Sequence, residues 1–323
     1  MFLSDWTPTQ TRESFAGMSP EATPPASPDR SVSGRMRRQR HPLYELTKPG
    51  IAGFVMITAG VSYHVATGGA SDFAPVLHAM GGTGIATGGA LAINQYVERD
   101  LDAQMRRTRT RPIPSGRITP GTALAFGLAL LVAGVAWLWA LVGWLPALLT
   151  AASAAGYIGL YTPLKRRSYL ATLVGAVPGA IPGLIGWSAA SGELPLGAWV
   201  LFGIYFLWQL PHVLALAWLL RDDYEKVGFF LMPPHDPDGR RVGKHMVYHS
   251  LSLLFLSVVP TLIGMTGWIY GVGALLLSGA MLASCVVAAG DMTTDNARRV
   301  FLGSLIYQPL LLLLLLVDIR PLM

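Results

Sequence analysis

Three side chains with oxygen ligands recur at every fourth position in the segment between residues 94 and 117. They are Asn94, Glu98 and Asp102. On an α-helix, a step of four residues turns about 40° past a full turn, so all three side chains lie on one face. Amide and carboxylate oxygens gathered on one face suit a hard cation such as Mg²⁺. The spacing therefore predicts a cation site at the end of the apolar stretch that precedes it.

Basic residues follow these oxygen ligands directly. They are Arg106, Arg107, Arg109 and Arg111. The planar guanidinium group matches the geometry of phosphate oxygens. Carboxylates and arginines in one short segment therefore predict a site for Mg²⁺ and a diphosphate. The alternative is a solvated cytoplasmic loop, which is basic because cytoplasmic loops of membrane proteins carry excess Lys and Arg.

Composition places these residues in a membrane protein. The 323-residue chain is 52% hydrophobic and 13% charged, and its mean hydropathy is +0.46. Apolar runs of about 20 residues, the length that crosses a bilayer as a helix, recur along it. We therefore expect an all-α polytopic membrane protein, with no nucleic-acid partner. Cys285 is the only cysteine, which excludes an intrachain disulfide and a CxxCH haem attachment.

We expect two regions, a disordered cytoplasmic tail over residues 1–40 and a membrane domain over residues 41–323. The tail is rich in Pro, Ser, Thr and Arg and lacks the apolar core of a signal peptide. About nine spans are expected in the domain, at Thr47–Thr67, Ala74–Val97, Gly121–Val142, Leu145–Tyr161, Tyr169–Ala190, Leu196–Leu220, Met246–Met265, Trp268–Ala288 and Ala297–Asp318. Their many Gly, Ala, Ser and Thr residues are interpreted as sites of close helix packing.

The connections between these spans alternate in charge, which predicts the orientation. Basic residues occur in residues 99–117, 165–167, 221–244 and 298–299, whereas residues 68–75, 142–145 and 191–195 have no Lys or Arg. The positive-inside rule places the basic connections and the N-terminus in the cytoplasm. We expect a bacterial inner membrane protein. A mitochondrial location is disfavoured because the tail contains acidic residues, which transit peptides avoid.

Ionisable residues at span ends are functional candidates because burying them in a membrane is costly. Lys48 begins the first expected span, and Lys165, Arg166 and Arg167 follow the fourth. In the sixth span, His212 and Asp223 are eleven residues apart, which returns to within about 20° on a continuous helix.

Gln209 lies about 40° from Asp223 on the same count. The sixth span is therefore expected to carry one polar stripe of Gln209, His212 and Asp223, unless Pro211 bends it. Asp223 would be the inward carboxylate at its end, and His212 would lie about 16 Å deeper. The alternative for His212 is a hydrogen-bonded core histidine.

The connection after the sixth span has simpler interpretations. Asp222 points away from the stripe and is expected to be a solvated acid paired with Arg221. His235 and Asp236 do not have the spacing of a zinc site. Residues 226–244 are expected to form a flexible loop that could cover the site.

The chain resembles the intramembrane UbiA-type prenyltransferases, and within them the protohaem IX farnesyltransferase branch. The resemblance covers about residues 46–309. It rests on TKPG (47–50), NQYVERDLDAQMRRTRTRPIPSG (94–116), YTPLKRRS (161–168), GAVPGAIPGLIGW (175–187), WQLPH (208–212), DY (223–224) and ARRVFLGSLIYQPLLL (297–312). The asparagine–acid–acid spacing indicates only the wider superfamily. RTxxRPxPSG, LKRR and WQxPH together are specific to the haem-modifying branch.

One departure from the superfamily pattern concerns the second aspartate-rich motif. Leu219 and Val227 occupy the positions that flank Asp223, so only Asp223 remains there. The same departure is typical of the haem-modifying branch. It leaves open how a second Mg²⁺ would be held.

The resemblance implies a UbiA-type helix bundle that transfers the farnesyl group of farnesyl diphosphate to the 2-vinyl group of haem B, giving haem O. It implies Mg²⁺ as cofactor. The implied metal ligands are Asn94, Glu98, Asp102 and Asp223, with His212 as a further catalytic candidate. The implied substrate contacts are Lys48, Arg107, Arg111, Lys165, Arg166, Gln209 and Tyr224. Membrane lipid, haem A synthase and terminal oxidase assembly factors are the expected partners.

Two other functions fit parts of the sequence. A UbiA-type enzyme with another acceptor, such as a quinone precursor or chlorophyllide, is disfavoured by WQLPH and by the single Asp223. A transporter or structural membrane protein would not need carboxylates and arginines at the ends of several helices on one side.

Overall fold

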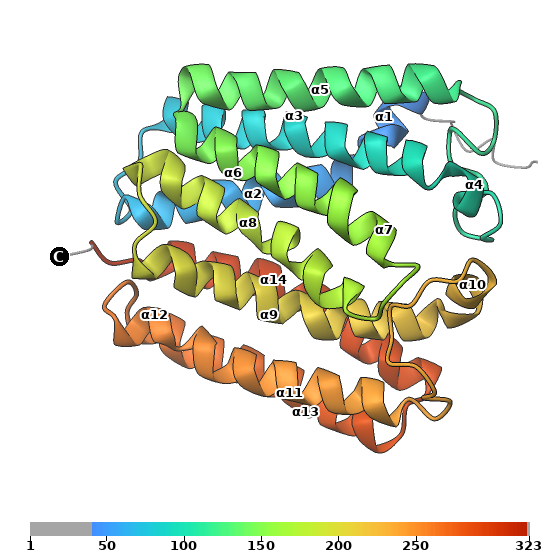
Figure 1. The fold of residues 1–323 in the computed structure, drawn as a ribbon. Coiled ribbons are helices and arrows are strands. Elements are labelled where there is room, and N and C mark those ends of the chain that lie inside the picture. The colour runs from blue at the N-terminus through green and yellow to red at the C-terminus, as the bar shows by residue number, and fades with distance from the viewer. Residues whose placement is uncertain (1–40, 322–323) are drawn as a thin grey trace, which may run out of the picture. The chain divides into compact units, whose positions relative to one another are not determined.

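The structure is a computed structural model that describes residues 41–321. Every regular element in this part is a helix (Figure 1), as the composition predicts. The helices are α1 (Pro42–Leu46), α2 (Pro49–Ala66), α3 (Phe73–Val97), α4 (Arg99–Asp102), α5 (Pro120–Leu141), α6 (Trp144–Ala155), η1 (Gly156–Tyr161), α7 (Thr162–Leu164), α8 (Ala171–Ser191), α9 (Leu196–Leu219), α10 (Arg221–Lys226), α11 (Arg240–Ser257), α12 (Val259–Leu262), α13 (Trp268–Gly290) and α14 (Thr294–Val317). The tail predicted for residues 1–40 lies outside the described residues.

The long helices lie side by side in one bundle (Figure 1). In the described part, eight helical segments are long and apolar enough to cross a membrane. The fourth expected span, Leu145–Tyr161, is not among these eight; it falls on α6 and η1, which follow one another without a break in helical backbone. The other eight expected spans each overlap one of these segments, and the chain is an integral membrane protein.

Close helix contacts explain the abundance of small residues. An added Cβ at Gly186 of α8 would lie 1.9 Å from the carbonyl oxygen of Ala59 in α2. At Gly89 of α3 it would lie 2.5 Å from the backbone nitrogen of Leu131 in α5. Both approaches are possible only without a side chain, which confirms the packing interpretation of these glycines.

The helix that carries His212 ends earlier than predicted. α9 stops at Leu219, and Leu220 has non-helical backbone angles (φ −110°, ψ 14°) before α10 begins. The prediction of one continuous helix from His212 to Asp223 is therefore wrong.

The segment after α10 packs onto the bundle. Val227, Phe229 and Leu231 are buried in a cluster with Met105. The backbone N–H of Phe230 donates to the carbonyl of Lys165 at 2.6 Å. We call residues 227–232 the cover segment. The flexible loop expected over residues 226–244 is therefore packed on the bundle in this part, and it is helical from Arg240 onward.

Candidate active site

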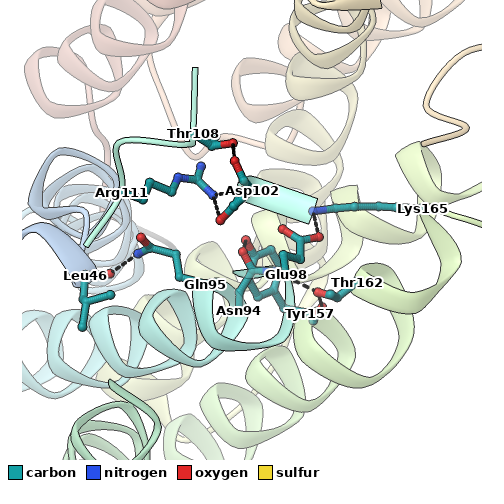
Figure 2. Close-up of polar contacts among 10 residues, drawn as sticks. All are labelled: Leu46, Asn94, Gln95, Glu98, Asp102, Thr108, Arg111, Tyr157, Thr162 and Lys165. Carbon is teal, nitrogen blue, oxygen red and sulfur yellow. Dashed lines mark hydrogen bonds and ion pairs between the residues drawn. The ribbon is translucent and has the colours of Figure 1, made fainter. Parts of the chain in front are cut away.

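The oxygen-bearing residues lie where α3 passes into α4. α3 ends at Val97, but the N–H of Glu98 still donates to Asn94 O at 2.9 Å and that of Asp102 to Glu98 O at 2.8 Å. The four-residue hydrogen-bond pattern therefore continues across the junction. All three side chains are buried, and they point into the same region (Figure 2).

Asp102 is paired with an arginine from the segment that follows it. Arg111 Nη1 donates to Asp102 Oδ1 at 2.7 Å and also contacts Oδ2. The hydroxyl of Thr108 donates to the backbone carbonyl of Asp102 at 2.9 Å. The turn between residues 103 and 111 thereby folds back and brings the guanidinium group over the carboxylate.

Glu98 is paired with a lysine from the other side of the site. Lys165 Nζ lies 2.8 Å from Glu98 Oε1, and both side chains are buried. The ammonium group also lies over the rings of Tyr161, at 4.4 Å from its centroid, and of Phe229 in the cover segment, at 5.5 Å. Two aromatic faces and one carboxylate therefore hold this cation in place.

Asn94 is oriented by residues that sequence reasoning did not single out. Its amide nitrogen donates to Thr162 Oγ1 at 3.1 Å, and its oxygen accepts from the Tyr157 hydroxyl at 3.3 Å. Tyr157 belongs to the π-helical turn η1 and Thr162 begins α7. A π-helical turn inserts an extra residue and is common at functional sites. The YTPLKRRS motif (161–168) includes Thr162 but not Tyr157, and the contact of either residue with Asn94 could not be derived from spacing.

Lys48 adds a third cation near the two ion pairs. It is a non-glycine residue in left-handed conformation (φ 44°), just before α2 begins, and Pro49 follows it. Burial and the positive charges of Arg111 and Lys165 lower the pKa of Lys48 to about 7. A site that contains three cations and two carboxylates is arranged to receive further negative charge.

The remaining predicted contacts differ in their exposure and in their neighbours. Arg107 and Arg166 are exposed at the surface. Tyr224 packs against the cover segment, with its ring 5.9 Å from that of Phe229. Asp222 is exposed beside Arg221, at 3.7 Å, as predicted.

Asp223 has its ion-pair partner outside this group. Its carboxylate lies 3.7 Å from Lys226 Nζ, and with Arg106 it borders a cavity of about 190 Å³. Within residues 41–321, no three His, Cys, Asp or Glu side chains gather as a ready metal site. Asn94, Glu98 and Asp102 supply two carboxylates and an amide, which fits Mg²⁺ completed by water and phosphate oxygens.

A mainly apolar cavity of about 390 Å³ adjoins this group inside the bundle. Tyr157 and Tyr161 line it, and these rings also contact Asn94 and Lys165. Gln209 and His212 line it from α9. Gln209 donates to the backbone carbonyls of Ala176 and Tyr205, both at 3.0 Å. The two predicted polar residues of α9 thus face the cavity, while Asp223 does not line it.

Comparisons with known proteins find relatives that match most of the chain. The model of the UbiA prenyltransferase family matches residues 55–312. A protohaem IX farnesyltransferase of Solibacter usitatus is 44% identical over 86% of this chain and 98% of its own. One from Opitutus terrae is 41% identical over 85% of this chain and 93% of its own. The mitochondrial human protein of the same name is 38% identical, over 86% of this chain and 62% of its own.

Solved structures share the fold at low sequence identity. A digeranylgeranylglyceryl phosphate synthase superposes with a TM-score of 0.72 and 16% identity, covering 85% of this chain and 96% of that one. A UbiA homologue from Archaeoglobus fulgidus bound to DMAPP and Mg²⁺ superposes with a TM-score of 0.59 and 14% identity, over 85% of this chain and 99% of that one.

Proposed function

The chain belongs to the UbiA prenyltransferase family, and we propose that it transfers farnesyl from farnesyl diphosphate to the 2-vinyl group of haem B, forming haem O. One observation carries the proposal. A buried group of carboxylates and cations, centred on Asn94, Glu98 and Asp102, shares Tyr157 and Tyr161 with an apolar cavity. Such a site can hold a diphosphate and an isoprenoid chain at once.

The chemistry at the charged end is departure of diphosphate from an allylic carbon. Mg²⁺, held by Asn94, Glu98 and Asp102, would supply charge neutralisation for that leaving group. In the structure, Glu98 and Asp102 are neutralised by Lys165 and Arg111. If these carboxylates held the cation, the two basic groups would be free to bind phosphate oxygens. Lys48 is placed to contribute a third such contact.

The cavity would surround the allylic cation that forms when diphosphate leaves. Its mainly apolar lining keeps water from the allylic cation until the vinyl group has attacked. The rings of Tyr157, Tyr161 and Trp208 line it and can stabilise positive charge through their faces. Attack by the vinyl group moves the positive charge to the acceptor, where water adds and releases a proton to leave the hydroxyl of haem O.

The membrane setting follows the same proposal. The charged group includes residues of the basic connections, and we assign these connections to the cytoplasmic side of a bacterial inner membrane. Farnesyl diphosphate has a charged head and an apolar tail, and haem is amphipathic, so both can approach from the membrane surface. Enzymes that modify or insert haem O, such as haem A synthase or terminal oxidase assembly factors, are the proposed partners.

The direct test is extraction of haems from membranes with and without this protein. We expect haem O only when the protein is present and farnesyl diphosphate is supplied. The Asp102→Asn variant, expressed to the same level, serves as control. Prenylated quinone precursor or chlorophyllide without haem O would instead assign the chain to another acceptor.

Lys48 leads to a prediction for the pH dependence of diphosphate binding. Because the pKa of Lys48 is about 7 in the free protein, the residue loses its charge as pH rises past 7. A bound diphosphate favours the charged form and raises this pKa, so binding above pH 7 requires proton uptake. We expect the affinity for a non-reactive farnesyl diphosphate analogue to fall, by up to about tenfold per pH unit above pH 7.

The measurement is a titration of the analogue at constant Mg²⁺ from about pH 6 to about pH 9. Lys48→Arg is the matched control because arginine stays charged throughout this range. Its affinity should lack the decline that wild type shows. Parallel curves for both proteins would mean that Lys48 does not titrate in the site.

A further inference from the structure

His212 is held between α9 and α14 by contacts on two of its sides. Its Nδ1 lies 2.7 Å from Ser304 Oγ. Its ring stacks on Phe301, at 4.8 Å between centroids, and on Trp208, at 5.6 Å. The indole N–H of Trp208 donates to the backbone carbonyl of Ser304 at 2.8 Å. Ser304 is therefore anchored twice to α9, once through its backbone and once through its side chain.

The contacts of Ser304 determine which nitrogen of His212 carries a proton. A serine hydroxyl has one hydrogen to donate. Ser304 Oγ lies 2.6 Å from the carbonyl oxygen of Phe301 and donates to it. If the hydrogen pointed to His212 instead, two oxygen atoms would face each other at 2.6 Å without a hydrogen between them. Ser304 Oγ therefore accepts from His212, whose Nδ1 carries the proton.

The other ring nitrogen is consequently unprotonated in neutral His212. Among the contacts of residues 41–321, Nε2 has no hydrogen-bond partner. The ring lines the mainly apolar cavity of about 390 Å³, whose lining includes no residue of α14. Phe301 and Trp208 stack on the ring and Ser304 contacts its Nδ1, which leaves the edge with the Nε2 lone pair for the cavity. An unprotonated imidazole nitrogen is a metal ligand. Because the rest of the cavity lining is mainly apolar, a metal that binds there would have to enter as part of a larger molecule that supplies its other ligands.

We propose that His212 Nε2 coordinates the iron of the haem acceptor, and that Ser304 is the positioning residue that holds His212 in this tautomer. The inference rests on the proposed function, because it assumes that haem enters the cavity. A hydrogen-bond partner on the second nitrogen is what orients metal-binding histidines in general and increases their basicity. The competing role for Nε2, as a base for the water that completes the reaction, requires no bond to iron.

Absorption spectroscopy of haem B bound to the purified protein separates these roles. Wild type should show the spectrum of histidine-ligated haem. His212→Ala should lose that spectrum, and added imidazole should restore it by filling the vacated space. Ser304→Ala should retain ligation but bind haem about tenfold more weakly, whereas Ser304→Thr, which keeps an oxygen at this position, should stay close to wild type.

His249→Ala is the matched control. This residue is a half-buried histidine of α11 that does not line the cavity, and its loss should leave the spectrum unchanged. If His212→Ala binds haem with the wild-type spectrum while wild type still forms haem O, the ligation is wrong and the proposed function stands. If wild type neither binds haem nor forms haem O, both fail. Loss of turnover in His212→Ala with an unchanged haem spectrum would identify the base.

Discussion

Asp102→Asn should lower farnesyl transfer by at least about 10³-fold and leave the protein folded. The substitution keeps the shape of a fully buried side chain and removes its negative charge. Asparagine cannot neutralise Arg111, which pairs with Asp102 in the structure. It is also a weaker ligand for a divalent cation. The measurement is single-turnover formation of haem O by purified variants, with thermal unfolding in the same detergent to verify folding.

Asp100→Asn provides the matched control for this experiment. Asp100 lies two residues before Asp102, but its side chain is 80% exposed. The same chemical change there should alter turnover by no more than about twofold, because exposed surface substitutions have small effects. If Asp102→Asn turns over at a rate near that of Asp100→Asn, Asp102 is only the structural partner of Arg111.

The prediction from spacing succeeded where the physics is local. The hydrophobic runs specify the helices, since about 20 apolar residues in a row form a membrane span almost regardless of their neighbours. The four-residue interval of Asn94, Glu98 and Asp102 fixes a common face, and the backbone hydrogen bonds across the α3–α4 junction preserve it. A short departure from helical backbone does not change which side these residues occupy.

Prediction failed where the outcome depends on tertiary contacts. Nothing in the apolar pattern before Asp223 marks the end of α9 at Leu219 or indicates that His212 and Asp223 border different cavities. The pairing of Asn94 with Tyr157 and Thr162 depends on a π-helical turn in another span. Such turns have no periodic signature in a sequence.

The partner of His212 shows the same limit. Ser304 lies 92 positions along the chain and reaches His212 only because α14 packs on α9. Ser304 lies within the motif of residues 297–312, but neither its spacing nor its residue type distinguishes it from the serines that pack between helices in other spans. Its role follows from the direction of the hydrogen bonds that its hydroxyl makes, and these can be read only from a structure.

Replacing both Glu98 and Lys165 should restore part of the stability that each single replacement loses, but none of the activity. Each side chain is less than a tenth exposed, at 8% for Glu98 and 9% for Lys165. Removing one leaves the other buried without its partner, so Glu98→Gln or Lys165→Met should each cost about 3 kcal/mol of stability. The double variant removes both charges, and about 2 kcal/mol of the summed loss should be recovered as coupling.

Activity should show no such recovery. The proposed function assigns Glu98 to the cation and Lys165 to the phosphates once substrate is bound, so each is needed in a different contact. The double variant should therefore be at least as inactive as the worse single variant, about 10³-fold below wild type. Apparent melting temperatures and single-turnover rates of the four proteins form one double-mutant cycle. Recovery of turnover together with stability would mean that the pair only supports the fold. Glu98 would then not bind the cation, and Lys165 would not bind the phosphates.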